Sequence, residues 1–174
     1  MTSKELESLE KQASLSNLLL RLQLRRPLNL WTFRLVVAQS TDTNIVKILG
    51  EMKGWAYEKS NGLQLDTMQV SPQANKGIGH LIWAATMAWA LESTPCKRAR
   101  LLAIHDDLNQ HNRLKKYFQK RGFQTVKEVG SAPMDLPLRI VWGGAGSLMT
   151  AECQEVFEYS RRLWELSESF KLND

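Results

Sequence analysis

The sequence predicts a mixed α/β fold, in which a mostly antiparallel sheet is flanked by helices. Strand-like runs at 31–37, 45–57 and 63–70 follow one another, and Asn61-Gly62 is a strong hairpin turn between the last two. After residue 70, helical spacing of apolar residues alternates with short apolar runs, which is typical of a β-α-β crossover. We therefore expect an antiparallel meander that continues into a crossover with a parallel strand pair.

The other elements each have a local signal. Residues 3–24 are mostly good helix formers with leucines on one face, and Pro27 ends this helix. In chain order, the elements expected after the meander are a helix at 77–93, a strand at 99–104, a helix at 109–121, strands at 124–129 and 138–142, and an added C-terminal helix from Leu148 to about Phe170. We divide the chain into an N-terminal helical segment at 1–30, a core at 31–146 and a C-terminal helix at 147–174, all in one compact domain.

Composition is typical of one soluble domain. The chain has 174 residues, of which 43% are apolar and 24% charged. No apolar run approaches the ~20 residues that a membrane span needs, and Glu5, Glu7 and Glu10 stand where a secretory signal has basic residues. Cys96 and Cys153 have no metal or redox spacing. We expect no metal site, reduced thiols and a cytoplasmic protein.

Positive charge is concentrated in two segments. The net charge is +5, and basic residues cluster at 97–100 and 113–121. Such a cluster is compatible with nucleic-acid binding, but a basic helix face more often meets water or an acidic small ligand. We expect no nucleic-acid partner.

The segment 65–82 is the strongest functional signal. It reads as a strand, a glycine turn and a helix start, and Gly77 and Gly79 leave backbone N–H groups of the first helical turn accessible. The helix dipole favours an anion there, and Lys76 adds a positive charge. A close-packed helix entry without a ligand is the alternative, because Gly-x-Gly alone is a weak motif.

Three features together resemble the GNAT superfamily of acyl-CoA N-acyltransferases: Val70-x-Pro72, the Gly77-x-Gly79 turn, and a tyrosine-containing helix that ends in Gly122-Phe123. The resemblance covers about 31–143. It implies transfer of an acetyl group from acetyl-CoA to a primary amine by direct attack. It also implies a cofactor site in which the strand backbone pairs with the pantetheine arm at Met68 and Val70 and the pyrophosphate lies on Lys76, Gly77, Ile78, Gly79 and His80.

The catalytic candidates follow from the same resemblance. Asp66 stands where many family members carry a glutamate that draws a proton from the amine, although it is also compatible with a solvent-facing strand residue. Tyr117 is the candidate acid for the leaving thiolate, yet Phe118 occupies the family's usual tyrosine position. Asn109 and Asn112 lie near the position of a cofactor-contacting asparagine, and one of them is compatible with a helix cap instead.

Some residues fit the family pattern poorly. The segment between Pro72 and Gly77 is one residue short, and a complete domain would have a first strand that this sequence lacks. A second function is therefore open: a non-catalytic GNAT-like interaction or assembly factor of a larger complex, which docks a protein partner or a second copy through its terminal helices and Trp164.

We expect the remaining residues of note to be structural: Trp83, Trp89 and strand residue Trp142 in the core, His80 and His105 as structural histidines, and His111 facing solvent. The acceptor amine is not readable, although loops at 51–55 and 131–137 would form its walls.

Overall fold

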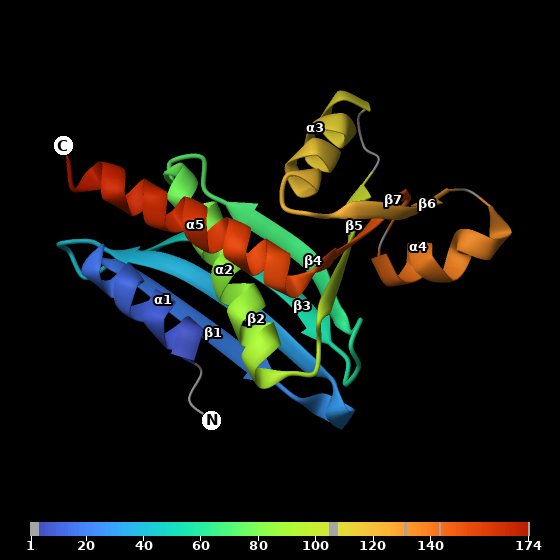
Figure 1. The fold of residues 1–174 in the computed structure, drawn as a ribbon, viewed down its shortest axis with the longest axis horizontal. Coiled ribbons are helices and arrows are strands. Elements are labelled where there is room, and N and C mark those ends of the chain that lie inside the picture. Colours follow the sequence, from blue (N-terminus) through green and yellow to red (C-terminus); the bar gives the residue numbers. More distant parts are fainter. Residues whose placement is uncertain (1–3, 105–107, 131, 143, 174) are drawn as a thin grey trace.

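The computed structural model describes residues 4–104, 108–130, 132–142 and 144–173 (Figure 1). The helices and strands among them are, in chain order, α1 Lys4–Leu15, β1 Leu18–Arg25, β2 Trp31–Ser40, β3 Val46–Ala56, β4 Leu63–Val70, α2 Lys76–Ser93, β5 Arg98–Ile104, α3 Leu108–Gln119, β6 Gln124–Val129, α4 Leu136–Trp142, β7 Gly146–Glu152 and α5 Cys153–Lys171, with short 3-10 turns at Pro27–Asn29 and Pro133–Asp135. Within these described ranges, no helix combines the length and the apolar character that a membrane span needs.

The strands form one seven-stranded sheet in the order β1-β2-β3-β4-β5-β7-β6. Strands β1 to β4 are an antiparallel meander, β4 and β5 pair in parallel, and β7 lies antiparallel between β5 and β6. The prediction of a mixed, mostly antiparallel sheet with a C-terminal helix is confirmed.

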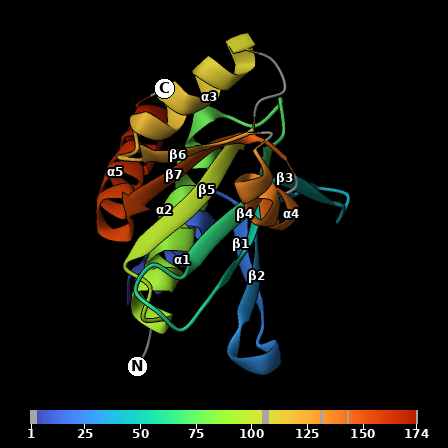
Figure 2. The same ribbon diagram turned by 90° about the vertical axis from the view of Figure 1, so that its right-hand side faces the viewer.

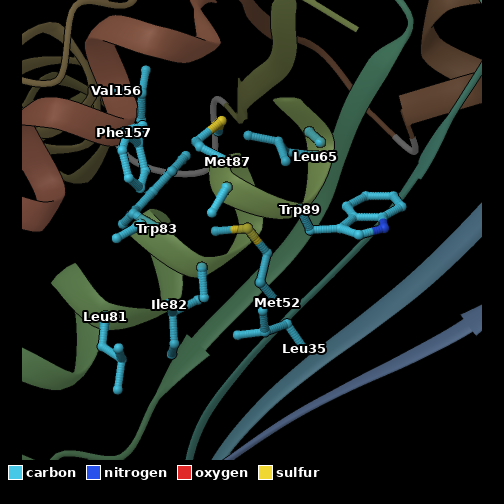
Figure 3. Packing of buried hydrophobic residues seen from close by; sticks show 14 of the residues in the cluster. Leu35, Met52, Leu65, Leu81, Ile82, Trp83, Met87, Trp89, Val156 and Phe157 are labelled. Atoms are coloured by element: carbon cyan, nitrogen blue, oxygen red, sulfur yellow. The ribbon is translucent and has the colours of Figure 1, made fainter. Parts of the chain in front are cut away.

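Helix α2 is the centre of the core. It is buried almost all round, because the sheet covers one side and α5 packs along the other (Figure 1). Its side chains meet Leu35 and Met52 of the sheet and Val156 of α5 (Figure 3). Trp83 and Trp89 are fully buried here, as predicted.

The N-terminal segment differs from the prediction. Helix α1 ends at Leu15, and 18–25 is strand β1, so the domain has the first strand that the sequence was expected to lack. Asn17 has φ 58°, a left-handed conformation that stops the helix. Leu18 and Leu20 are buried while the residues after each are more exposed, which is the period of a strand.

The C-terminal third also differs. Residues 138–142 belong to helix α4 rather than a strand, since Pro137 suits the first turn of a helix. The last strand is β7, at residues we assigned to the final helix, which instead begins at Cys153. Most residues of β7 are buried on both faces of the sheet, so polar and apolar residues do not alternate along it in the way that identifies a half-exposed strand.

Two predictions about tryptophans change with these elements. Trp142 lies in α4 and not in a strand, and its side chain is outside the described residues, as is His105. Trp164 is fully buried and donates a hydrogen bond through Nε1 to Gln12 of α1 at 3.0 Å. Trp164 therefore fastens α5 to α1 and is not available to a docking partner.

Figure 2 turns the molecule so that α1, α2 and α5 lie together and α4 lies away from them. Leu138 of α4 packs against the buried pair Val129 and Leu148, as does Leu102 of β5. Leu102 alternates along β5 with Leu101 and Ala103, which face the α2 core, so α4 covers the opposite face of the sheet.

Candidate functional site

The site begins where β4 and β5 part. The two strands pair only from Leu63 to Leu65 and from Ala99 to Leu101. Beyond these residues they separate and leave an open cleft of about 800 Å³ that α3 borders. Its lining residues are Asp66, Thr67, Met68, Val70, Leu102, Ile104, Gln110, Arg113, Leu114, Tyr117 and Phe118.

Asp66 enters the cleft because of a β-bulge. In the pairing of β3 with β4, Leu65 lies opposite Gly54 and Thr67 lies opposite Lys53, so Asp66 is the extra residue. A bulge re-aims the side chain it carries. The Asp66 carboxylate is solvent-exposed and accepts a hydrogen bond from the Thr67 hydroxyl at 3.2 Å. Because it is exposed, the Asp66 carboxylate can contact a ligand that enters the cleft.

Tyr117 also lines the cleft, from α3. Its Oη accepts a hydrogen bond from Trp83 Nε1 at 2.9 Å, and it lies 4.0 Å from where a Cβ at Gly79 would stand. Because the indole nitrogen only donates, the phenol keeps its own hydrogen for another acceptor. Phe118 lines the same cleft and adds no polar atom.

Arg121 is a buried cation beside this tyrosine that the sequence reading missed. Its side chain is 4% exposed, stacks over the Tyr117 ring at 3.9 Å and donates to the Tyr117 carbonyl at 3.4 Å. Burial lowers the pKa of Arg121, although an arginine keeps its charge. Arg121 lies in the turn after α3, and its position four residues after Tyr117 is the local signal that could have pointed to the stack.

His80 contacts Arg121 and not the cleft. One guanidinium nitrogen lies 3.1 Å from His80 Nδ1, so Nδ1 accepts and the ring is neutral. Burial and then the charge of Arg121 lower the pKa of His80 to about 4. His80 is therefore a structural histidine in the first turn of α2.

Two backbone N–H groups in the first turn of α2 already donate hydrogen bonds to acceptors within the chain. Asn75 is its N-cap, and the Asn75 Oδ1 accepts from the Gly77 N–H at 3.0 Å while the Asn75 carbonyl accepts from the Ile78 N–H at 3.2 Å. A Cβ at Gly77 would stand 2.5 Å from Ser167 Oγ of α5. Gly77 is thus packed closely against α5, while Lys76 is exposed.

The asparagine candidates lie at the start of α3, and both are exposed. The described lining of the cleft contains Gln110 and Arg113 of that helix and neither Asn109 nor Asn112. Met68 and Val70, the residues expected beside the pantetheine arm of the cofactor, line the cleft. The segment 51–55, expected as a loop, is part of strand β3.

His111 is buried and not solvent-facing. Its Nδ1 lies 3.1 Å from the Ile104 carbonyl and its Nε2 lies 3.2 Å from the Ser147 hydroxyl, which donates to the Glu128 carboxylate at 2.7 Å. These bonds join α3 to β5, β6 and β7. The prediction failed because the polar neighbours of His111 come from strands distant in sequence.

An antiparallel meander that continues into a β-α-β crossover is the arrangement that the sequence resemblance implies. The observed topology is therefore the one expected of a GNAT-type fold. No family model and no curated protein matches the chain.

Solved structures that resemble the chain include an uncharacterized protein, an acetyltransferase and an N-acetylglutamate synthase. An uncharacterized protein of Bacillus halodurans is 17% identical over 78% of this chain and 66% of its own, with a TM-score of 0.48. Nourseothricin acetyltransferase is 11% identical over 79% of this chain and 88% of its own, with a TM-score of 0.48. N-acetylglutamate synthase from Neisseria gonorrhoeae, solved with coenzyme A and N-acetyl-glutamate, is 17% identical over 87% of this chain and 32% of its own, with a TM-score of 0.43.

Proposed function

We propose that this protein is an N-acetyltransferase that moves the acetyl group of acetyl-CoA to a primary amine by direct attack. The observation that carries the proposal is the cleft between the parted strands, because Asp66 and Tyr117 both line it. A base and an acid in one cleft are what an amine attack on a thioester requires. The proposal extends to a cytoplasmic location, consistent with the free, buried thiols of Cys96 and Cys153.

The cofactor arm would lie along β4. Beyond Leu65 this strand no longer pairs with β5, so its backbone groups on that side can pair with an extended ligand at Met68 and Val70. The pyrophosphate would lie on the turn at 76–80, with Lys76 as the exposed cation. For this, Asn75 must release the Gly77 N–H to the phosphate.

Proton transfer would run through two side chains. Asp66, exposed at the bulge, would take a proton from the amine, directly or through a water. Tyr117 would donate its hydrogen to the leaving thiolate while Trp83 Nε1 holds the phenol oxygen. The Arg121 cation over the ring stabilises negative charge that develops on that oxygen.

The test is an acetyl-transfer assay that follows release of the CoA thiol from acetyl-CoA in the presence of a panel of primary amines. We expect amine-dependent thiol release that falls in Tyr117→Phe and persists in Phe118→Tyr. Thiol release that no amine accelerates, at a protein concentration sufficient to bind the cofactor, would contradict the proposal.

Two observations favour the second candidate, a non-catalytic interaction or assembly factor. Asn75 already occupies part of the anion site, and a phenylalanine stands at the family's usual tyrosine position. Large apolar side chains are also exposed near the ends of α1 and α5, and these are Leu15, Leu166, Phe170 and Leu172. In this function a protein partner or a second copy would cover them. Light scattering of the wild type and of Phe170→Asp distinguishes the second copy, since only a dimer through this surface would dissociate.

A further inference from the structure

Two cations and one carboxylate lie together on the face of β2 and β3 that turns away from the α2 core. Helices α1, α2 and α5 lie together on the other side of the sheet (Figure 2). Side chains alternate between the two faces along a strand, and Leu35 of β2 and Met52 of β3 face the core. Their neighbours Arg34, Glu51 and Lys53 therefore point to the opposite side.

This cluster carries one positive charge in excess. Arg34 Nε donates to Glu51 Oε2 at 2.7 Å, one terminal guanidinium nitrogen lies 2.7 Å from the same oxygen, and Lys53 Nζ lies 3.1 Å from Glu51 Oε1. The bond from Arg34 lowers the pKa of Glu51, so this carboxylate is ionised at neutral pH. The Arg34 and Lys53 side chains are 40% and 46% exposed. Both cations can therefore contact an anion that arrives from solvent.

The cluster borders a second open hollow, of about 680 Å³. Arg34, Glu51 and Gln69 are among the polar residues that line it. Met68 and Val70 line both this hollow and the cleft between β4 and β5, so the two meet along β4. A concave site of this size with a few polar groups is typical of small-ligand binding.

Lys53 also lies next to the proposed base. The β-bulge sets both Asp66 and Thr67 against Lys53 of β3. The Thr67 hydroxyl donates to Asp66, and Thr67 precedes the core-packed Met68, so Thr67 shares the open face with Lys53. Opposite residues on neighbouring strands have Cβ atoms about 5 Å apart. Arg34, which lies opposite Lys53 on β2, is one strand further away, at about 10 Å from the bulge.

We propose that the acceptor of acetyl transfer is a small primary amine whose other end carries a carboxylate, with Arg34 and Lys53 binding the carboxylate and Asp66 facing the amine. The inference rests on the proposed function and names its substrate class. The amine nitrogen bonds to the acetyl carbon as the thioester C–S bond breaks, its proton passes to Asp66, and the thiolate takes the hydrogen of Tyr117. Solvent then returns the proton of Asp66 to the tyrosinate.

The test compares amines that differ in this one charge, through release of the CoA thiol from acetyl-CoA. The acids are β-alanine, γ-aminobutyrate and ε-aminocaproate, which differ in chain length, and each is paired with its own carboxamide. For at least one pair, the wild type should have a kcat/KM about tenfold or more higher for the acid, because a hydrogen bond to a charged group changes affinity by about that factor.

Two variants assign the preference to the cluster. Arg34→Gln should raise the KM for the preferred acid about tenfold, with a larger change in KM than in kcat, and Lys53→Gln should act in the same direction. Arg98→Gln is the matched control. Arg98 pairs with Glu152 across β5 and β7 at 2.9 Å, has a side chain that is 45% exposed, and lines neither the hollow nor the cleft.

The outcomes separate this inference from the proposed function. Equal kcat/KM for acids and carboxamides, or an unchanged preference in both Arg34→Gln and Lys53→Gln, would overturn the acceptor class and leave acetyl transfer to amines intact. An equal loss of preference in Arg98→Gln would also overturn it, since overall charge would then decide. No thiol release with any amine would overturn both proposals. If Arg34→Gln does not fold, Lys53→Gln supplies the measurement.

Discussion

The two halves of the candidate cofactor site differ in how far they are prepared for a ligand. In the cleft half, β4 and β5 stop pairing after Leu65 and Leu101 and leave an open volume. In the turn half, the Asn75 side chain accepts a hydrogen bond from the Gly77 N–H, and Ser167 of α5 packs against the same glycine. The cleft is open to an extended ligand as it stands, whereas the turn must exchange an internal hydrogen bond for a phosphate.

Because of this difference, we expect the two halves of the site to contribute differently to cofactor affinity and to the rate of acetyl transfer. Charge-assisted hydrogen bonds from backbone N–H groups to a phosphate are stronger than the bond to the Asn75 amide oxygen, so the exchange is favourable but costs part of the gain. Binding energy should therefore depend on the turn, and turnover on the cleft.

The largest effect is expected from Gly79→Glu, which places a carboxylate in the turn. Affinity for CoA should fall by about 100-fold or more, because like charges brought together cost several kcal/mol and each 1.4 kcal/mol is tenfold. Thermal unfolding should stay close to that of the wild type. A Cβ at Gly79 would lie 3.8 Å from Met68 Cε, which is ordinary contact, so Gly79→Ala is the control that should bind normally. Equal affinity of both variants would remove this turn as the phosphate site.

Asp66→Asn should have the next largest effect, on turnover alone. Loss of a general base lowers the rate constant by about 100-fold or more, while the affinity for acetyl-CoA stays unchanged because the cofactor half is intact. Steady-state kinetics and calorimetry measure the two quantities. Asp42→Asn, in the exposed turn between β2 and β3, is the matched control. Equal losses of turnover and affinity would argue against a base at Asp66.

Asn75→Ala should have two opposite and smaller effects. Loss of the N-cap destabilises the fold by about 1 kcal/mol, measured by chemical denaturation. The same change should strengthen CoA binding by about fivefold, because the free protein no longer gains a bond that the ligand must displace. Asn173→Ala, at an exposed position after α5, is the control. Weaker binding in Asn75→Ala would mean that Asn75 helps to hold the ligand.

The smallest effect concerns His80 in the turn. Its pKa is lowered from 6.5 to about 4 in the folded protein, so the unfolded chain binds the proton more readily between these values. The free energy of unfolding should therefore fall as pH decreases from 6.5 toward 4, and this dependence should be weaker in His80→Gln. Denaturation curves at pH 7 and pH 5 measure it. Parallel pH profiles for the two proteins would show that His80 titrates normally.

The sequence predicts the middle of this fold better than its ends. Strand β4, helix α2 and strand β5 each have a distinct period and clear turn residues, so their positions follow from local signals. Strand β1 was missed because leucines at 18, 20 and 22 satisfy a strand period while the preceding leucines satisfy a helix period. Its pairing with β2, which decides the matter, is a long-range contact.

The residues of the candidate site also differ in how well the sequence predicts them. Asp66 and Tyr117 were named from the family resemblance, and both line one cleft in the structure. Asn75 as the cap, Arg121 against the Tyr117 ring and the burial of His111 were missed, because each depends on which elements pack together. The family resemblance thus supplied the candidates for chemistry, and packing revealed which backbone N–H groups already have acceptors within the chain.

Calorimetric titration of the wild-type protein with acetyl-CoA, with plain CoA as competitor, tests the central claim most directly. We expect binding in the micromolar range, and competition by CoA that shows both ligands use one site. No heat of binding at millimolar acetyl-CoA would contradict the claim. It would mean that Asn75 does not release the Gly77 N–H and that the open cleft holds no cofactor. The non-catalytic interaction function would then replace acetyl transfer as the proposal.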